Sequence, residues 1–341
     1  MDVESRPANP PQVALERERA LELLSRGRRF VLSGHQRPDG DCLGAQAALA
    51  SLLVDQGREV WIYNPDLPEK RYAYLGEKVQ QRAFSGGELP VHDVAVLLDF
   101  SELTRTGDLA PVLSKNPSKK LVVDHHIHVG APWWDACYVD VTASATGLLV
   151  RRIARELGWK LDRAAAQGVF TSLVTDTGWF KYSNTDAETL AVAAEMLAYG
   201  VEPARIFDQL YQQRTRHHPA YIGKLLARTE YLADGRLAVV DQPLAENVDP
   251  NLVDSDELLD ILRSVGCVEV VLFLREIQNG TCKLSARSKT GYDVNALARR
   301  FGGGGHKKAS GATIPGKLVD VRAQLVAAAL EGFGAAAPLP R

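Results

Sequence analysis

The sequence is poor in cysteine and has no long apolar run. Its four cysteines, among 341 residues, are far apart and form no C-x-x-C pair, so a disulfide framework is not expected. We interpret them as reduced thiols of a cytoplasmic protein. The longest apolar runs have the length of a strand, and the charged N-terminal stretch lacks an apolar core. We therefore expect neither a membrane span nor a secretion signal.

An excess of charge of either sign is also missing. The formal net charge is −2 and the sequence pI is about 6.5, which argues against a partner such as long duplex nucleic acid, because proteins that bind it usually carry a broad basic surface. A short or small anionic ligand held by a few local cations is compatible with this balance. The length suits two modest domains.

Short apolar runs rich in β-branched residues recur in the first half of the chain, and each is typical of a buried parallel strand. They are Phe30–Ser33, Val60–Tyr63, Val94–Leu98 and Leu121–Val123. Apolar residues from Leu43 to Val54 share one helical face between the first two runs, which predicts a β-α-β unit. Further helices are predicted over Ser144–Leu157, with Ser144 as N-cap, and over Arg163–Val174. We therefore expect an α/β domain that binds ligands at the carboxyl ends of its strands.

The second half predicts a helical connector over residues 187–233 and then a smaller α/β unit. We expect His217 and His218, within the connector, to be solvated. The strands predicted for the second unit are Leu237–Asp241, Glu269–Glu276, Thr281–Arg287 and Ala312–Ile314. Its predicted helices are Ser255–Ser264, Asp293–Phe301 and Leu318–Leu330. The domain boundaries that follow are 1–186, 187–233 and 234–335.

Acidic residues and histidines follow several of the predicted apolar runs of the first domain. The segments are His35-x-x-x-Asp39-x-Asp41, Asp99, Asp124-His125-His126 and, in Thr-Asp-Thr-Gly, Asp176. A single loop aspartate is usually a helix cap or turn residue. Four such groups at equivalent strand ends would repel one another unless cations occupied the site. Imidazole with carboxylate suits Mn²⁺, Fe²⁺, Co²⁺ or Zn²⁺.

These segments resemble, in order and spacing, the four motifs of the DHH phosphoesterase superfamily. Phe301-Gly-Gly-Gly-Gly-His306 and Ala309-Ser-Gly-Ala312 resemble the glycine motif of the DHHA1 domain, and Ser285-Ala-Arg287-Ser-Lys before it is similar to that family. The resemblance covers about Phe30 to Leu330. It implies an N-terminal DHH domain with a mainly parallel sheet and a C-terminal α/β DHHA1 domain. The layout is most similar to the bacterial nanoRNase/pAp-phosphatase group.

The resemblance implies two divalent metal ions, Mn²⁺ foremost, with Co²⁺ or Mg²⁺ as alternatives. His35, Asp39 and Asp99 would hold one ion. The other would be held by Asp41, Asp99, His125 and Asp176, so that Asp99 bridges the two. His126 would contact the phosphate or assist the leaving oxygen, and Asp124 would orient a ligand histidine. Together the ions would activate water and neutralise charge on phosphorus.

In the second domain, the sequence predicts an anion-binding glycine loop. Its members are Gly302, Gly303, Gly304 and Gly305, whose backbone N–H groups no side chain obstructs. Arg287 could bind a phosphate bidentately and His306 could hydrogen-bond to it. Arg105 and the stretch 179–183 could contact phosphate or a base, although such aromatic residues more often pack. Cys42 could be a metal ligand, but a small buried residue is the favoured interpretation.

We therefore expect a metal-dependent phosphoesterase that hydrolyses short oligoribonucleotides and 3′-phosphoadenosine 5′-phosphate. Hydrolysis of a cyclic dinucleotide or its linear product is an alternative, and a non-catalytic RNA-binding or regulatory module is an alternative of another class. Cleavage polarity, the physiological metal and the choice between a monomer and a homodimer stay open.

Overall fold

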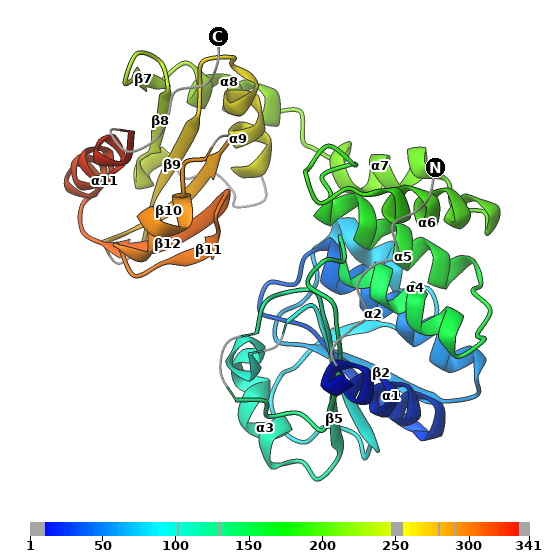
Figure 1. The fold of residues 1–341 in the computed structure, drawn as a ribbon. Coiled ribbons are helices and arrows are strands. Elements are labelled where there is room, and N and C mark those ends of the chain that lie inside the picture. The colour runs from blue at the N-terminus through cyan, green and yellow to red at the C-terminus, as the bar shows by residue number, and fades with distance from the viewer. Residues whose placement is uncertain are drawn as a thin grey trace. The chain divides into compact units, whose positions relative to one another are not determined.

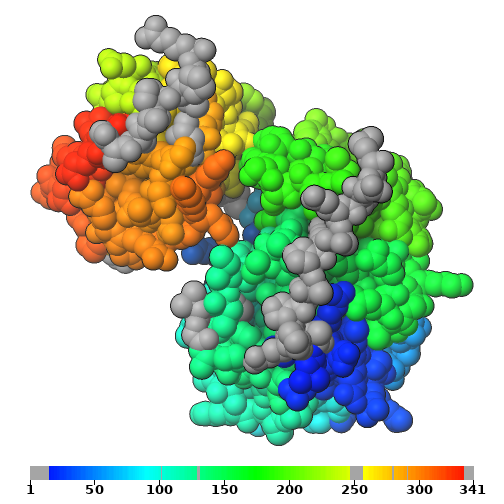
Figure 2. Space-filling view, in the orientation of Figure 1, coloured from blue at the N-terminus to red at the C-terminus, as the bar shows by residue number. Residues whose placement is uncertain are grey.

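The computed structural model describes residues 11–100, 102–128, 131–246, 255–278, 280–289 and 291–333. The chain divides into two compact units, Met1–Gln213 and Arg214–Arg341. The first is coloured from blue to green, and the second from yellow-green to red (Figure 1; Figure 2). Within the described residues, no helix has the length and apolar character needed to cross a membrane.

The first unit is built on a parallel sheet with the strand order β3-β2-β1-β4-β5-β6. The strands are β1 (Arg29–Ser33), β2 (Glu59–Asn64), β3 (Gln81–Ala83), β4 (Val94–Leu98), β5 (Lys119–Asp124) and β6 (Ala136–Val139). The chain order reverses between β1 and β4, and in open α/β sheets ligands bind beyond the carboxyl ends of strands at such a point. The predicted α/β class with a mainly parallel sheet is confirmed.

Helices cover both faces of this sheet. They are α1 (Pro11–Arg26), α2 (Gly40–Asp55), α3 (Ala110–Lys115), α4 (Thr146–Glu156), α5 (Arg163–Asp176), α6 (Ala187–Ala198) and α7 (Pro203–Tyr211), with the 3₁₀ segments η1 (Lys70–Gly76) and η2 (Leu103–Leu109). Alternate strand residues face two cores, as Leu32 packs with the helices α2, α4 and α5 while Val31 packs on the side of η2 and α3. Residues 40–53 of α2 are all buried, which places this helix at the centre of the unit.

Two local expectations for the first unit differ from the structure. Ser144 does not cap α4, because the N-cap residue is Ala145 and the Ser144 hydroxyl accepts a hydrogen bond from Thr189 instead. Asp176 does not end a strand. It is the last residue of α5, whose apolar residues reach the edge of the site along a helix.

The second unit has a mixed sheet with the strand order β11-β12-β10-β9-β8-β7, in which only β8 and β9 pair in parallel. The strands are β7 (Glu230–Leu232), β8 (Leu237–Gln242), β9 (Val270–Ile277), β10 (Thr281–Ser288), β11 (Gly304–His306) and β12 (Ala309–Pro315). Helices α10 (Val294–Arg299) and α11 (Leu318–Phe333) cover one face, whereas α8 (His218–Leu226) and α9 (Ser255–Ser264) cover the other beside β8 and β9. The short segment η3 (Leu244–Glu246) follows β8.

The stretch expected to be a connector, residues 187–233, is shared between the two units. Helices α6 and α7 pack into the first core, as the buried Ile206 and Leu210 show. Helix α8 and strand β7 belong to the second unit, where Tyr221 and Leu225 are buried. His217 is exposed as expected, but His218 is 3% exposed and lies 2.7 Å from a Glu257 carboxylate oxygen. It therefore belongs to the packing between α8 and α9.

Candidate metal centre

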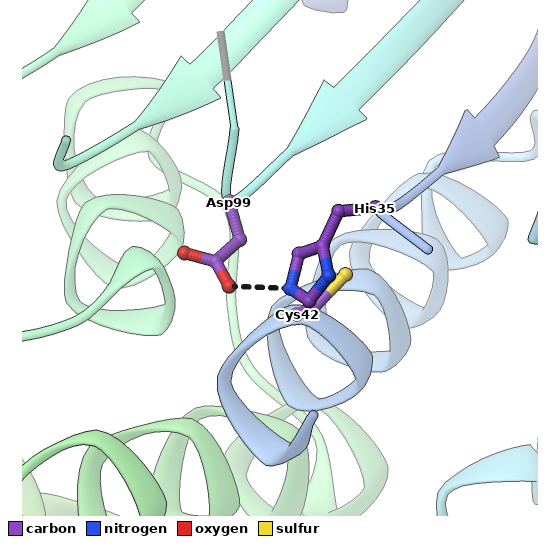
Figure 3. A group of neighbouring side chains, drawn as sticks. All are labelled: His35, Cys42 and Asp99. Atoms are coloured by element: carbon purple, nitrogen blue, oxygen red, sulfur yellow. Dashed lines mark ion pairs between the residues drawn. The ribbon is translucent and has the colours of Figure 1, made fainter. Parts of the chain in front are cut away.

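His35 and Asp99 meet at the point where the strand order reverses. His35 lies just beyond β1 and Asp99 directly follows β4, and the imidazole Nε2 is 3.4 Å from a carboxylate oxygen of Asp99 (Figure 3). Both side chains are buried. Asp99 has a φ of +70°, a left-handed conformation that costs a non-glycine residue on the order of 1 to 3 kcal/mol. The fold holds this residue in a strained conformation where the two strands end.

Two further carboxylates come from the start of α2. Asp39 is the N-cap residue, and its Oδ1 accepts hydrogen bonds from the backbone N–H groups of Asp41 and Cys42. Its second oxygen, Oδ2, lies 4.0 Å from the Nε2 of His35. The cap interpretation and the ligand interpretation of Asp39 are thus compatible, because each uses a different oxygen.

Asp41 is fixed by groups that are distant in sequence. Its carboxylate accepts hydrogen bonds from the backbone N–H groups of Thr146 and Gly147, at 2.9 and 3.3 Å, and from the hydroxyl of Ser172. Thr146 and Gly147 open α4, whose positive N-terminal end favours negative charge. The Thr146 hydroxyl also donates to Asp99, at 3.1 Å. The N-terminus of α4 therefore holds two of the predicted ligands together.

His125 completes the cluster with a nitrogen that has no hydrogen-bond partner among the described residues. Its Nδ1 lies 3.1 Å from the carbonyl oxygen of Ala143, which orients the ring. The buried Nε2 is 3.4, 3.5 and 3.9 Å from oxygens of Asp41, Asp99 and Asp176, respectively, without a hydrogen bond to any of them. A buried imidazole nitrogen facing three carboxylates is an incomplete arrangement that a cation would complete.

These spacings match those of ligand atoms around an ion. Donor atoms that bind one ion at 2.0 to 2.2 Å lie roughly 2.8 to 3.6 Å apart in tetrahedral or octahedral geometry. The contacts of His35 and His125 with Asp99 fall in this range, and those with Asp39 and Asp176 lie slightly beyond it. Imidazole and carboxylate donors suit Mn²⁺, Fe²⁺, Co²⁺ and Zn²⁺. The residues present therefore fit two divalent ions.

The pKa values of the clustered side chains show that the cluster favours positive charge. Burial alone would lower the pKa of His125, but the surrounding carboxylates, Asp99 foremost, raise it to about 11. Burial opposes ionisation of Asp99, yet His125 and His35 hold its pKa well below the usual range. Burial and the Asp99 carboxylate raise the pKa of Asp41 well above its usual value. Protons thus partly neutralise the metal-free cluster, and bound cations would replace them.

Asp124 orients His126 rather than His125. Its Oδ1 lies 2.8 Å from the Nδ1 of His126 and also accepts that residue's backbone N–H. The His126 ring meets the His125 ring edge to face with centroids 4.5 Å apart, and its Nδ1 lies 3.6 Å from Asp99. The expectation that Asp124 orients a ligand histidine needs correcting, because the backbone carbonyl of Ala143 orients His125 instead.

Helices α2 and α5 cross in direct backbone contact behind the ligands. A Cβ atom on Gly44 would lie 2.5 Å from the Gly168 carbonyl oxygen, and one on Gly168 would lie 2.6 Å from the Gly44 oxygen. Asp41 lies at the start of α2 and Asp176 at the end of α5. This crossing therefore sets the separation of two predicted ligands. Sequence reasoning did not single out Gly44, Gly168, Thr146 or Ser172, because their partners are more than 100 residues away or on another helix.

The structure also places three other residues that the sequence suggested, namely Arg105, Trp179 and Cys42. The carbonyl oxygen of Arg105 accepts the Gln36 backbone N–H at 2.8 Å, which joins η2 to the loop that carries His35, and the Arg105 side chain is exposed. Trp179 packs edge to face on Phe170 and Phe207, in agreement with the packing interpretation. Cys42 is fully buried beside His35 (Figure 3).

The predicted anion-binding residues of the second unit lie on one face of its sheet. Arg287 pairs with Ala309 across β10 and β12, and Ala309 pairs with His306 across β12 and β11. Directly opposed residues project to the same face, so Arg287 and His306 stand two strands apart, about 9.5 Å. Arg287 donates to Asp256 at 2.6 Å. The next row is Ser285, Gly311 and Gly304, whose small size leaves this face open.

The glycine motif is partly strand, and backbone geometry explains most of it. Gly302 and Gly305 have φ of +75° and +138°, and a Cβ on Gly303 would lie 2.2 Å from the Gly311 carbonyl oxygen. Gly304 is different, because a Cβ there would meet nothing within 4 Å. Gly304 to His306 form the edge strand β11 instead of the loop that we expected. The fold would therefore accept a side chain at Gly304.

The fold and the candidate metal centre are those expected of a metal-dependent phosphoesterase. Residues 29–201 match the model of the DHH family, N-terminal domain, and residues 243–333 match that of the DHHA1 domain. The chain belongs to the DHH phosphoesterase family and carries a C-terminal DHHA1 domain.

Comparison with individual proteins narrows the relationship to one group of that family. The chain is 30% identical over 293 residues to the bifunctional oligoribonuclease and PAP phosphatase NrnA of Thermus thermophilus, covering 85% of this chain and 86% of the relative. It is 28% identical to the protein of the same name from Bacillus subtilis, covering 84% and 89%. An exopolyphosphatase-related protein from Bacteroides fragilis shares the fold, with a TM-score of 0.84, 23% identity and coverage of 94% and 96%.

Proposed function

We propose that the protein is a Mn²⁺-dependent two-metal phosphoesterase that hydrolyses short oligoribonucleotides and 3′-phosphoadenosine 5′-phosphate. The observation that carries the proposal is the buried Nε2 of His125, which lies within 4 Å of the carboxylates of Asp41, Asp99 and Asp176 and has no hydrogen-bond partner among the described residues. The activities named for the relatives from Thermus thermophilus and Bacillus subtilis support the choice of substrates.

The ligands divide into two sets that share Asp99. His35, Asp39 and Asp99 would hold one ion, and Asp41, Asp99, His125 and Asp176 would hold the other. When bound, such ions lower the pKa of water and neutralise charge that develops on a phosphoryl group. The choice of Mn²⁺ rests on the mixed imidazole and carboxylate donors and on the solved complex of RecJ from Thermus thermophilus with Mn²⁺. That structure has a TM-score of 0.55 and is 15% identical to this chain, and the match covers all of this chain and 57% of RecJ.

His126 is the residue of the centre that we assign to proton transfer or phosphate binding rather than to metal binding. Its Nδ1 is engaged by the buried Asp124, which fixes the plane of the ring and stabilises its protonated form. Although burial alone would lower the pKa of His126, Asp124 and Asp99 raise it. A protonated imidazole can hydrogen-bond to a phosphoryl oxygen or protonate a leaving alkoxide.

In the second unit, we assign phosphate binding to the sheet face that carries Arg287 and His306. Arg287 and His306 offer charged and polar groups to a phosphate, and the small residues of the neighbouring row, Ser285, Gly311 and Gly304, leave room for a ligand close to the backbone. Gly302 and Gly303 shape the turn that leads into β11, and Gly305 is part of the strand. With a net charge of −2, the chain has no excess of cations for a long nucleic acid track, which favours substrates of a few nucleotides.

A product time course tests the proposal. Purified protein with Mn²⁺ is incubated separately with a diribonucleotide, a longer oligoribonucleotide, a cyclic dinucleotide and 3′-phosphoadenosine 5′-phosphate. We expect rapid turnover of the first and last substrates. Preferred turnover of the cyclic dinucleotide would support the alternative phosphodiesterase, and Mn²⁺ binding without turnover of any of the four would support the non-catalytic module.

A further inference from the structure

Three buried polar side chains form a continuous hydrogen-bond network beneath the loop that carries His35. They are Cys42 and Gln46 of α2 and Asn64, the last residue of β2, and each is 0% exposed. The Nε2 of Gln46 donates to the Oδ1 of Asn64 at 2.7 Å, and the Nδ2 of Asn64 donates back to the Oε1 of Gln46 at 3.0 Å. The same Gln46 nitrogen lies 3.4 Å from the Cys42 sulfur.

This network reaches the backbone on both sides of the metal centre. The Oδ1 of Asn64 accepts the backbone N–H of Gly34 at 2.9 Å, one residue before His35. The Cys42 thiol donates to the carbonyl oxygen of Leu98 at 3.6 Å, one residue before Asp99. The three side chains thus link the residues that precede two predicted ligands of the same ion.

The packing at Gly34 shows how closely this loop rests on the network. A Cβ atom on Gly34 would lie 2.1 Å from the Cys42 sulfur, 2.5 Å from Gln46 Nε2 and 3.1 Å from Asn64 Oδ1. The side-chain amides of Gln46 and Asn64 hydrogen-bond to each other, so each has few donor and acceptor directions left for other partners. A buried polar network of this kind fixes one arrangement, whereas apolar side chains of the same volume would tolerate several.

We propose that Cys42, Gln46 and Asn64 are positioning residues. They fix the separation of His35 and Asp99 and so set the affinity of the protein for the ion that these two ligands share. The inference rests on the proposed two-metal function. We assign none of the three side chains to the ion itself, although the Cys42 sulfur lies within 4.8 Å of the ligand atoms of His35 and Asp99. They act through the backbone at Gly34 and Leu98, and metal ligands must be held to about 0.5 Å for productive geometry.

Matched variants separate a positioning role from a general loss of packing. Gln46→Met removes the amide from the network, and Gln81→Met serves as the control. Gln81 is 9% exposed and donates its Nε2 to the carbonyl oxygen of Leu43 on the same helix, at 3.0 Å. A milder pair is Cys42→Ala and Cys282→Ala. Both thiols are 0% exposed and both donate to a carbonyl oxygen at 3.6 Å, but Cys282 lies in the second unit.

Mn²⁺ binding is measured by calorimetric titration of the metal-stripped proteins, and stability by thermal unfolding in the presence of EDTA. We expect Gln46→Met to weaken one of two Mn²⁺ sites at least tenfold, and Cys42→Ala to weaken it by a smaller factor. The two controls should lose comparable stability and keep both affinities. If Gln46→Met does not fold, the comparison of Cys42→Ala with Cys282→Ala decides the test.

The possible failures are distinct from one another. Absence of Mn²⁺ binding in the unsubstituted protein would refute the proposed function itself. Two intact Mn²⁺ sites in destabilised Gln46→Met or Cys42→Ala protein would overturn the positioning role, because the network would then serve stability alone. Equal losses of affinity in a variant and its control would overturn it as well.

Discussion

Replacing Gly168 by alanine tests whether the contact between α2 and α5 controls the second ion site. The new Cβ would lie 2.6 Å from the Gly44 carbonyl oxygen and 2.7 Å from the Ala48 backbone nitrogen. Close carbon to oxygen contacts in proteins lie at about 3.3 Å or more, so the helices must separate by about 0.7 Å. Both obstacles are backbone atoms, and neither can rotate away.

The expected cost follows from two opposing terms. Overpacking a tightly packed core costs about 1 to 3 kcal/mol, while alanine gains about 1 kcal/mol over glycine inside a helix. We therefore expect a net loss of up to about 2 kcal/mol, and a decrease in Tm of up to about 4 to 8 °C for a unit of this size. The displacement also exceeds the tolerance of about 0.5 Å for a working site. Because the crossing sets the distance from Asp41 to Asp176, affinity for one Mn²⁺ should fall at least tenfold.

Gly223→Ala is the matched control, because Gly223 also lies in a helix, α8, and a Cβ there would meet nothing within 4 Å. It should stabilise the protein by about 0.4 to 1 kcal/mol and leave Mn²⁺ binding unchanged. The measurements are thermal unfolding in EDTA and calorimetric titration with Mn²⁺. Wild-type stability together with wild-type metal affinity in Gly168→Ala would refute the reasoning about the helix crossing.

Three further predictions concern the centre and the substrate. Asp99→Asn should abolish most turnover, since it weakens both ion sites, and should leave the circular dichroism spectrum unchanged. The control Asp135→Asn, at a surface residue that pairs with Lys119, should have no effect. Near-normal rates for Asp99→Asn in saturating Mn²⁺ would exclude the two-metal assignment. EDTA should inhibit, and Mn²⁺ or Co²⁺ should restore activity; turnover that persists after metal loss is verified by elemental analysis would contradict this. Arg287→Ala should reduce kcat/KM for a diribonucleotide by a factor that corresponds to about 2 to 5 kcal/mol, the cost of losing a charged contact buried by the ligand. The loss for p-nitrophenyl phosphate should be much smaller and the metal content unchanged; equal losses on both substrates would place Arg287 elsewhere in the mechanism.

The four central strands of the first unit, β1, β2, β4 and β5, were predictable because each is a short run rich in apolar residues. Val94–Leu98 is identical in prediction and structure, and Val60–Tyr63 lies inside β2. The strands β3 and β6, at the edges of the sheet, escaped prediction. Their three and four residues, Gln81–Ala83 and Ala136–Val139, are too short and too mixed in polarity to give a period. Pairing with a longer neighbour, rather than local sequence, makes them strands.

Long-range contacts explain where local reasoning about the site was wrong. Ser144 is of a residue type that commonly caps helices. However, Asp41, about 105 residues earlier, accepts the first N–H groups of α4 and makes a local cap unnecessary. Asp124 precedes both histidines in sequence, and only the turn after β5 decides that its carboxylate reaches His126. Residue types and spacing could predict which groups gather, but not which neighbour each one contacts.

The two proposed ion sites depend on different kinds of support, although they share Asp99. At the site of His35 and Asp99, the backbone N–H of Gly34, just beyond β1, donates to the buried Asn64 amide, and the Cys42 thiol donates to the carbonyl oxygen of Leu98 at the end of β4. The other site brings Asp41 and Asp176 together from two helices, and their separation depends on a glycine contact with no side chain between them. Hydrogen bonds fix the position of Asp41 at the start of α4, but its distance from Asp176 follows the packing of α2 against α5. Substitutions in the helix layer should therefore disturb the second site before the first, and Asp176, whose side chain is 33% exposed against 2% for Asp41, should be displaced before Asp41.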